Sequence, residues 1–538
     1  MFKKNPFWEY FYFDIRFLFA YFNFKFITMK KYLTVSFIAM VFFISCKKSG
    51  LNGDESTAPE KFTSQQIDAF IKKTIETAHK FEWSSASDAM IWSALQESDQ
   101  VLSVGYKPAD ENTSAIKMET VDINDAKWLN AKNEVLNIIL TEEQKSDKLI
   151  VLKNIIQWEE NILPVIDIRV VSFATIQKLR ASKWVRYAEP MGYEPKDVLG
   201  KVLSSSGCGS NVAEPGLLET VDYTTILPAS KESWNYKYHA IPQAWTKSTG
   251  TGVKVFIIDT GCEFDQENLG SAFNQGYSSG RTVDKLVTLP RSTFFGIPTG
   301  PVETPDDGCG HGTSMAGACA GPRGTDGAAC GVAYNCNLIV CRAAADVYMD
   351  ESREVKGASD AFTNAANRAD VKIISMSMGK ITSSSQLSDA IQYAYGKGKL
   401  IFCAAGTSFS WAAGWFGVIF PAYLSQVNAV TGVRDNNYNT SCTDCHNGSE
   451  TDFTVVMEKA SNERHPLSLA MSGDAPSTVG GSSVSTATTA GIAALVWSRF
   501  PTLTRDQVLT KLIQSSANYP TRNSSLGWGN INADAATN

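Results

Sequence analysis

Three short segments carry an aspartate, a histidine and a serine, the residue types of a nucleophilic proton relay. Asp259 ends the apolar run V-K-V-F-I-I-D-T-G, His311 lies in G-H-G-T-S-M-A-G-A-C-A-G, and Ser483 lies in G-G-S-S-V-S-T-A-T-T-A-G. In such a relay the hydroxyl attacks, the imidazole takes its proton, and the carboxylate holds the imidazole in the right tautomer. Of the five histidines in the chain, only His311 has this context.

Each of these residues lies where an element is expected to begin or end. Val253–Ile258 is a β-branched run that predicts a buried parallel strand. Asp259 then lies at the carboxyl edge of that strand, where open α/β sheets carry their sites. The small residues after His311 and the apolar run after Ser483 predict two tightly packed helices. A serine at the start of a helix is close to free backbone N–H groups, which stabilise an oxyanion.

The order of these segments resembles that of the subtilisin-like serine proteases, the subtilases, from about Trp234 to the C-terminus. By that resemblance Asp259 is the orienting acid, His311 the general base and Ser483 the nucleophile of a serine endopeptidase. The segment G-W-G-N-I-N-A near the C-terminus also resembles a subtilase ending. The alternative is that the three residues are a strand-end turn residue, a helix cap and a loop residue.

The resemblance also implies which residues contact the substrate. The segment V-K-I-I-S-M-S-M-G corresponds to a subtilase edge that pairs with the substrate backbone like an added strand. The implied substrate-binding residues are Ser377, Met378 and Gly379, with Ala404, Ala405 and Gly406 nearby.

The segment L-I-F-C-A-A-G-T departs from the family at its last residue. Subtilases have an asparagine there, whose side chain donates to the oxyanion, and this chain has Thr407. Losing such a donor costs on the order of 10²–10³ in rate. Three readings stay open: the Thr407 hydroxyl donates, directly or through water; a neighbour such as Ser408 or Ser410 donates; or activity is impaired. The third supports a second hypothesis, an inactive subtilase fold that binds peptides or partners.

The expected fold class is α/β. We expect a three-layer α/β/α subtilisin-like domain with a mostly parallel sheet and right-handed crossovers, preceded by a small α+β propeptide-like domain. The predicted divisions are 1–28, upstream of the true start; 29–45, a lipoprotein signal peptide; 46–60, a lipidated cysteine and tether; 61–195, the propeptide-like domain; 196–233, a linker with the autocleavage bond; and 234–538, the peptidase domain.

The region before the peptidase domain contains periodic segments. Ser64–Lys80 predicts an amphipathic helix. Further on, the pattern predicts a strand at Val165–Val171, a helix at Ala174–Ala181 and a strand at Trp184–Glu189. This second part resembles the inhibitory propeptide of subtilases, which assists folding of the protease and then blocks its cleft. A large parallel sheet folds slowly, so a template is useful. An unrelated accessory domain is the alternative.

The N-terminal region contains a targeting signal. Met29 opens a basic start, an apolar stretch of about a dozen residues and then Cys46. This resembles a bacterial lipoprotein signal, in which Cys46 is lipidated and becomes the mature N-terminus. The apolar stretch is too short to span a membrane comfortably. We therefore expect an extracytoplasmic protein anchored by lipid to a bacterial membrane, at the outer membrane or cell surface. A plain secretory signal, giving a secreted protein, is the alternative.

Composition limits the partners. The chain has 538 residues, a formal net charge of −6 and only 19% charged residues, so nothing indicates nucleic-acid binding. The expected partners are polypeptide substrates, the chain's own propeptide and, through lipid, a membrane. No cofactor is expected and no metal is assigned. Structural calcium is left open, with two acidic groups as candidates: Asp306 and Asp307, and Glu263, Asp265 and Glu267.

The eleven cysteines suit an oxidising compartment, where disulfides form. Cys262 and Cys309 flank the predicted acid and base, so a bridge there would stiffen the site. Cys319 and Cys403 are expected to be buried free thiols. The segment C-T-D-C-H at 442–446 matches a c-type haem attachment pattern, but its polar surroundings favour a disulfide, either local or to another loop.

Overall fold

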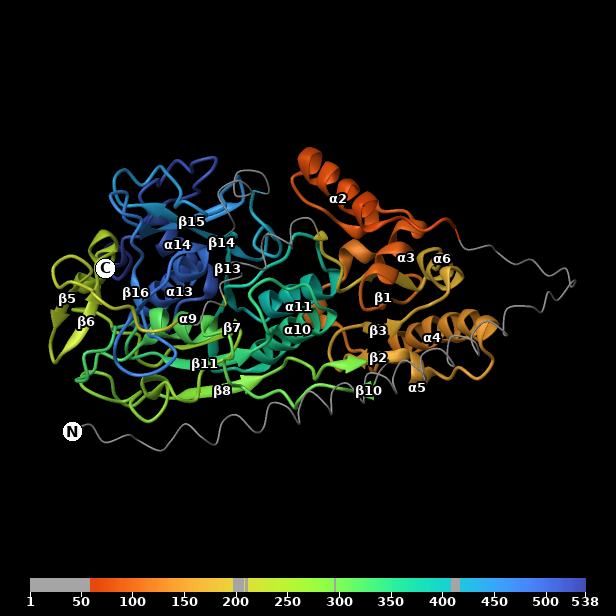
Figure 1. Ribbon diagram of the computed structural model, residues 1–538, viewed down its shortest axis with the longest axis horizontal. Helices are drawn as coiled ribbons and strands as arrows, with labels where there is room; N and C mark the ends of the chain where they lie inside the picture. Colours follow the sequence, from red (N-terminus) through yellow and green to blue (C-terminus); the bar gives the residue numbers. More distant parts are fainter. Residues whose placement is uncertain (1–58, 197–207, 209–210, 295–296, 408–416) are drawn as a thin grey trace, which may run out of the picture. The chain divides into compact units, whose positions relative to one another are not determined.

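The computed structural model describes residues 59–196, 208, 211–294, 297–407 and 417–538 (Figure 1). The predicted signal at 29–45, Cys46, Ser408 and Ser410 lie outside these residues, as do residues 197–207 and 209–210 of the predicted linker. In the described ranges, no helix has both the length and the apolar character needed to cross a membrane. Residues 58–538 form one unit.

Residues 59–196 form an α+β domain around a four-stranded sheet of order β2-β3-β1-β4, in which every pairing is antiparallel. Its core includes Ile67, Ile71 and Ile75, which lie on one face of α2. The helices and strands are α2 (Ser64–Ala78), α3 (Asp88–Glu97), β1 (Val101–Tyr106), α4 (Ala126–Ser146), α5 (Leu152–Ile155), β2 (Ile156–Glu159), β3 (Val165–Arg169), α6 (Phe173–Arg180) and β4 (Val185–Pro190), with 3₁₀ turns η1 (Trp83–Ser85), η2 (Thr113–Ala115) and η3 (Met118–Thr120).

The predicted elements of this domain are present with small shifts at their ends. The amphipathic helix α2 begins after Thr63, whose hydroxyl accepts from the Gln66 backbone in a capping box. The strand predicted from Val165 ends at Arg169. Helix α6 lies one residue earlier than predicted, and β4 lies one residue later. The spacing of apolar residues in the sequence was therefore enough to place these helices and strands.

The rest of the chain forms the α/β domain. Its elements in chain order are β5 (Tyr223–Ile226), β6 (Ser230–Ser233), η4 (Tyr236–His239), α8 (Ile241–Ala244), β7 (Lys254–Asp259), η5 (Glu267–Leu269), β8 (Val283–Val287), β9 (Thr293–Phe294), β10 (Ile297–Pro298), α9 (His311–Ala320), β11 (Asn337–Arg342), α10 (Ser352–Asn367), β12 (Val371–Met376), α11 (Ser385–Gly396), β13 (Leu400–Ala404), β14 (Asn428–Arg434), β15 (Thr451–Glu458), β16 (Leu467–Ser468), β17 (Ser477–Thr478), α13 (Gly481–Arg499), α14 (Arg505–Gln514) and α15 (Ala533–Ala536).

A seven-stranded sheet of order β15-β14-β13-β12-β7-β11-β8 forms the centre of this domain. All of its pairings are parallel. Alternate residues of β7 enter different cores: Val255 and Ile257 pack on the α9 and α13 side, whereas Phe256 and Ile258 pack on the α10 and α11 side. Because both faces are covered, the strands are apolar along their length.

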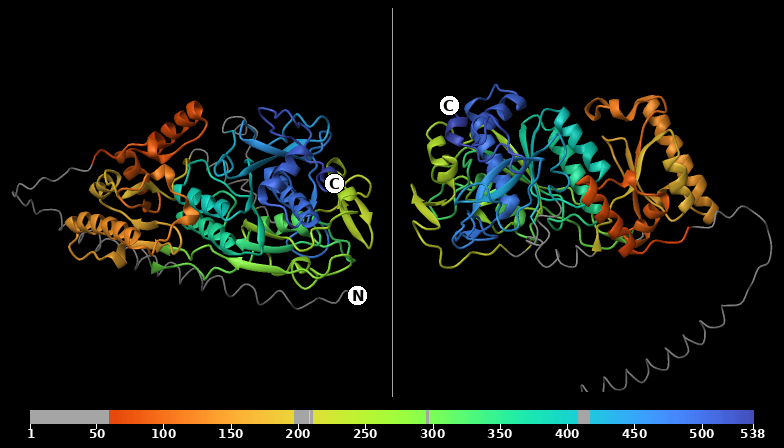
Figure 2. Two further views of the ribbon diagram at one scale, coloured as in Figure 1. Left: turned by 180° about the vertical axis from the view of Figure 1, so that it is seen from behind. Right: turned by 90° about the horizontal axis from the view of Figure 1, so that it is seen from above.

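Helices lie on both faces of the sheet, which confirms the three-layer α/β/α architecture. Figures 1 and 2 show α10 and α11 running side by side. Helix α13 contacts five strands (β7, β12, β13, β14 and β15) from the opposite face and also packs against α9. Thr504 caps α14 through a capping box with Gln507.

The N-terminal domain contacts the α/β domain at the starts of α10 and α11. Asp99 accepts from the Ser352 hydroxyl (2.8 Å) and backbone (3.3 Å), at the start of α10. Glu189 accepts from the Ser385 backbone (2.5 Å) and hydroxyl (3.0 Å), at the start of α11. The first N–H groups of a helix have no intrahelical partner, and a carboxylate there also suits the helix dipole.

This interface buries charged groups. Arg186 makes two hydrogen bonds to Asp389 on α11, at 2.9 and 2.7 Å, and both side chains are almost inaccessible to solvent. Asp167 lies nearby and accepts from Gln386 at 3.0 Å. Burial raises the pKa of Asp167 to about 7, and burial also raises the pKa of Glu189 to about 7. The interface therefore holds the pKa of each of these two acids above its value in the unfolded chain.

We expect the stability of the full chain to fall as pH rises from about 4 to about 7. In this range the folded state binds more protons than the unfolded state, since the folded pKa values of Asp167 and Glu189 are raised. Each additional proton bound by the folded state lowers the free energy of unfolding by about 1.4 kcal/mol per unit rise in pH. Urea unfolding at pH 5, 6 and 7 should give a shallower slope for Asp167→Asn than for the wild type. Glu76→Gln, at an exposed position on α2, is the control; equal slopes for all three proteins would contradict this account.

Candidate active site

Asp259 is the last residue of β7 and is fully buried. Its Oδ1 atom accepts from the backbone N–H of Thr260 at 2.8 Å and contacts Nδ1 of His311 at 2.7 Å. The sheet edge therefore holds the carboxylate rigidly and aims one oxygen at the imidazole. Its other oxygen, Oδ2, is buried without a hydrogen-bond partner among the described residues.

His311 is the first residue of α9 and is also buried. Burial by itself would lower its pKa, but the charge and hydrogen bond of Asp259, with smaller contributions from Asp307 and Asp346, raise the pKa above its ordinary value. The aspartate thus stabilises the protonated imidazole, which is the state that forms when a base accepts a proton.

Asp307 organises the start of α9. Its Oδ1 accepts from the backbone N–H of Gly310 (2.8 Å) and the hydroxyl of Thr260 (2.8 Å). Its Oδ2 accepts from the backbone N–H (2.8 Å) and the hydroxyl (2.7 Å) of Thr313. This fully buried carboxylate therefore connects the residue after Asp259 to the helix that begins with His311.

Two of the calcium candidates, Asp306 and Asp307, accept hydrogen bonds from protein donors. Asp307 is engaged by protein donors on both oxygens, and Asp306 accepts from the Phe264 backbone at 3.0 Å. Across the described ranges, no group of three or more His, Cys, Asp or Glu residues is placed to hold a metal ion.

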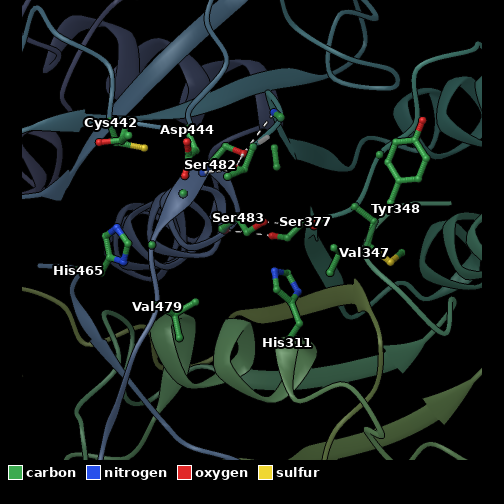
Figure 3. A pocket seen from close by; sticks show the side chains of 18 of the residues that line it. His311, Val347, Tyr348, Ser377, Cys442, Asp444, His465, Val479, Ser482 and Ser483 are labelled. Carbon is green, nitrogen blue, oxygen red and sulfur yellow. Dashed lines mark hydrogen bonds between the residues drawn. The ribbon is translucent and has the colours of Figure 1, made fainter. Parts of the chain in front are cut away.

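Ser483 is the third residue of α13 and is half-buried. Its hydroxyl donates to the carbonyl of Ser377 at 3.4 Å, and the Ser377 hydroxyl donates to the Ser483 carbonyl at 3.0 Å. Figure 3 shows Ser483 and His311 facing the same cavity from different helices. For proton transfer the serine hydroxyl must turn from Ser377 toward the imidazole, and such hydrogen bonds are often loose without substrate.

The turn before Ser483 requires a glycine. Gly481 has a φ of +80°, and a Cβ atom there would lie 2.8 Å from the Thr407 hydroxyl oxygen. A side chain would therefore be strained and would push Thr407 away from the serine turn.

One cleft of about 610 Å³ collects most of the predicted site residues. His311, Ser377, Met378, Gly379, Ala404, Gly406, Thr407 and Ser483 all line it. Asp259 lies behind His311, and Ala405 is buried beneath the cleft, where its N–H donates to Val430. Further lining residues include Val347, Tyr348, Asp444 and His465, which the sequence analysis did not single out (Figure 3).

The backbone of Gly379 is already paired within the protein. Its N–H donates to Val347 at 3.1 Å, and its carbonyl accepts from Met349 at 3.0 Å. A substrate strand that used both groups of Gly379 would have to displace the Val347–Met349 segment. No pattern in the sequence indicates this pairing, because it joins loops that follow two different strands.

Thr407 lies exposed at the rim of the cleft, where its hydroxyl contacts Ser482. The Thr407 Oγ1 accepts from the Ser482 backbone N–H at 3.0 Å and lies 2.8 Å from the Ser482 hydroxyl oxygen. The Ser482 hydroxyl in turn accepts from the Gly406 backbone at 3.2 Å. The hydroxyl of Thr407 is therefore held next to Ser483. Its own proton is free to donate elsewhere when the Ser482 hydroxyl is the donor in the 2.8 Å contact.

Four cysteines among the described residues form two disulfides. Cys442 and Cys445 form the local disulfide, and the backbone of Cys445 pairs with that of Thr407. Cys309 bonds to Cys208 of the linker, and Cys262 is a buried free thiol, so these two residues are not bridged to each other. Cys319 and Cys403 are buried free thiols, as predicted.

Together these residues form a relay from a buried carboxylate to an imidazole and on toward a serine at the start of a helix. The backbone N–H of Ser483 and the hydroxyl of Thr407 are the nearest candidates to stabilise a negatively charged oxygen. The lining of the cleft beside them includes Asp444 and Tyr348.

Comparison with known proteins gives matches that include the α/β domain of this chain. The family model described as the subtilase family matches residues 250–529. Thermitase of Thermoactinomyces vulgaris is 28% identical over 202 residues, which is 37% of this chain and 62% of thermitase. Subtilisin DY of Bacillus licheniformis is 28% identical over 292 residues, 53% of this chain and 91% of that protein. A crystal structure of MycP1 from Mycobacterium smegmatis has a TM-score of 0.45 and 22% identity, covering 61% of this chain and 88% of that one.

In Asp259→Asn we expect the pKa of His311 to fall below 6.5, because burial then outweighs the remaining charges. NMR titration of the histidine rings measures this directly. His239 and His446 serve as internal controls, since burial lowers their pKa to about 4 and neither contacts Asp259 in the described bonds. An unchanged or higher pKa for His311 in this variant would show that Asp259 does not set its charge.

Proposed function

This chain belongs to the subtilase family, and we propose that it is a serine endopeptidase that hydrolyses peptide bonds through Ser483, His311 and Asp259. The observation that carries the proposal is the 2.7 Å contact between Asp259 and His311 at the edge of a cleft that Ser483 also lines. If Asp259 were only a turn residue and His311 only a helix cap, their buried side chains would not need to contact each other.

In the proposed reaction Ser483 Oγ attacks the carbonyl carbon of the scissile bond, and His311 takes the hydroxyl proton. Asp259 stabilises the resulting imidazolium. His311 then gives the proton to the leaving amine, which leaves an acyl group on Ser483. Water hydrolyses this acyl-enzyme by the same route, with His311 again acting as base.

The negative charge that develops on the substrate oxygen needs donors in this site. The Ser483 backbone N–H supplies one, because it belongs to the first turn of α13. We assign the second to the Thr407 hydroxyl. Its oxygen accepts from the Ser482 N–H, and its proton can point to the substrate when the Ser482 hydroxyl donates in the contact between the two side chains. Thr407 thereby takes the role that asparagine has in subtilases.

Extended polypeptide is the proposed substrate, lying along Ser377, Met378 and Gly379, with Ala404 and Gly406 also lining the cleft. The Gly379 hydrogen bonds to Val347 and Met349 oppose full strand pairing. A substrate that leaves these bonds intact contacts Gly379 without pairing with its backbone, and Tyr348 then keeps its place beside the cleft.

The N-terminal domain is proposed to be the propeptide. Its support is the way Asp99 and Glu189 complete the starts of α10 and α11, because these contacts stabilise helices that flank the parallel sheet. Autocleavage is proposed in the 196–233 linker. The Cys208–Cys309 disulfide keeps the linker beside the catalytic base whichever bond is cut upstream of it.

We further propose that the protein is extracytoplasmic and anchored to a bacterial membrane through a lipid on Cys46. The signal-like segment from Met29 to Cys46 supports this proposal. The disulfides at Cys208 and Cys442 agree with an oxidising compartment.

A catalytically impaired, peptide-binding subtilase fold is the second candidate. Two observations favour it: the threonine at position 407 and the direction of the Ser483 hydroxyl toward Ser377. A single labelling experiment separates the two functions.

A fluorophosphonate probe should label the folded, processed protein, and mass spectrometry should find the label on Ser483. Ser483→Ala should lose the label, and His311→Ala should lose most of it, because the base no longer activates the hydroxyl. Ser498→Ala, at a half-buried serine hydrogen-bonded to Thr251, is the matched control and should label like the wild type. A folded and processed protein that neither takes the label nor cleaves casein would favour the binding function.

If the Thr407 hydroxyl stabilises the oxyanion, Thr407→Ala should lower kcat by about 10²-fold with little change in KM. Thr407→Asn should retain activity, since an amide is the donor at this position in subtilases. Thr510→Ala, which removes an exposed hydroxyl on α14, is the control. Equal kcat values for Thr407→Ala and the wild type would assign the donor elsewhere.

A further inference from the structure

The α/β domain contains a receptor for a carboxylate next to its cleft. In this structure it holds the side chain of Glu194, which belongs to the N-terminal domain and is completely buried. Every donor to this carboxylate comes from the α/β domain, from Tyr348 and the consecutive residues 380–382.

The donors cover both carboxylate oxygens. Oε2 accepts from the Tyr348 hydroxyl at 2.5 Å and from the Ile381 backbone N–H at 2.9 Å. Oε1 accepts from the Thr382 backbone N–H at 3.2 Å and from the Thr382 hydroxyl. The Lys380 ammonium lies 3.3 Å from Oε1. Five donors thus meet two oxygens, an arrangement that matches a carboxylate and gives the nitrogen of an amide nothing to donate to.

Lys380 makes this receptor depend on the N-terminal domain. Its side chain is 1% exposed, and its ammonium contacts Glu194 and the Met191 carbonyl (2.9 Å). Both of these groups belong to the N-terminal domain. A buried ammonium that loses its partners is strongly disfavoured, so departure of that domain leaves a positive charge and several free donors that need a new anion or water.

The receptor is continuous with the cleft. Lys380 directly follows Gly379, and Tyr348 both lines the cleft and donates to Glu194. Figure 3 shows Val347 and Tyr348 at the end of the cleft opposite Asp444 and His465, with Ser377 and Ser483 between them. A chain that extends from the nucleophile along Ser377–Gly379 therefore leads toward this receptor.

We propose that Tyr348, Lys380, Ile381 and Thr382 form a carboxylate-binding subsite of the α/β domain, which Glu194 occupies here and which takes an acidic side chain of a polypeptide substrate once the N-terminal domain has left. The second part rests on the proposed peptidase function. The first part does not, so the two are tested separately.

Chemical rescue tests the receptor without any catalysis. In the full chain carrying Ser483→Ala, the further change Glu194→Ala removes the carboxylate and opens a space beside Lys380. The melting temperature should fall, and propionate should restore more than half of the loss. Propionamide, which has a similar shape without the charge, and an equal concentration of potassium chloride should not. With Lys380→Met added, propionate should lose its advantage over propionamide.

Equal effects of propionate and propionamide on the Glu194→Ala chain would overturn the receptor. If that chain does not fold, a double-mutant cycle of Glu194→Gln with Lys380→Met replaces the rescue. Coupling between the two changes is then expected, and strictly additive losses of melting temperature would overturn the proposal.

Paired peptides test the substrate class. Pairs of fluorogenic peptides that differ only by Glu or Gln at one position are compared as substrates of the processed wild-type protein. In successive pairs this position lies one residue further from the scissile bond. At one position on the Ser377–Gly379 side, Glu should give a kcat/KM about 10-fold above Gln, the size of one charge-assisted contact. Lys380→Met should bring this ratio close to one, whereas Lys237→Met, at an exposed lysine, should leave it unchanged.

A ratio near one at every position, in an enzyme that cleaves the peptides, would overturn the acidic substrate class. If the wild type cleaves none of the peptides and takes no fluorophosphonate label, the peptidase function itself fails. The propionate experiment still decides whether the receptor binds a carboxylate.

Discussion

The common carboxyl edge of the parallel sheet is the constraint on which the rest of this site depends. Strands β7, β12 and β13 run in one direction, so Asp259, Ser377 and Ala404 are brought to the same edge although up to 145 residues separate them in the sequence. Helices α9 and α13 begin close to that edge and carry His311 and Ser483. Because the sheet is covered on both faces, the edge is the part of it where polar side chains meet a cleft.

Carboxylates accept hydrogen bonds from free backbone N–H groups at several places along this edge. Asp307 serves the start of α9 from within the α/β domain. The N-terminal domain supplies Asp99 to α10, Glu189 to α11 and Glu194 to the turn after Gly379. The α/β domain therefore relies on its neighbour for anions at three places. The contacts that dock the N-terminal domain are therefore the same contacts that satisfy the free N–H groups at the starts of these helices.

Much of the fold was predictable because local patterns are strong here. The strand before Asp259, the helix that starts at His311 and the helix after Ser483 follow from runs of β-branched or small apolar residues. The capping box at Thr504 and the amphipathic face of α2 are equally local. The pairing of Cys309 with Cys208 was not predictable, since many pairings of the cysteines satisfy the same sequence. Nor was the closed pairing of Gly379 with Val347 and Met349, which depends on how two loops approach each other.

The sequence by itself determined the residue types, their order and the elements that carry them: an aspartate after a strand, a histidine and a serine at two helix starts, and a threonine at position 407. Only the tertiary structure decided which groups meet. It directs the Ser483 hydroxyl to Ser377, holds Thr407 against Ser482, and buries Glu194 beside Lys380. The reason is that periodicity and turn chemistry act over a few residues, whereas a hydrogen bond between distant segments depends on rotamers and loop paths that the whole packed core fixes.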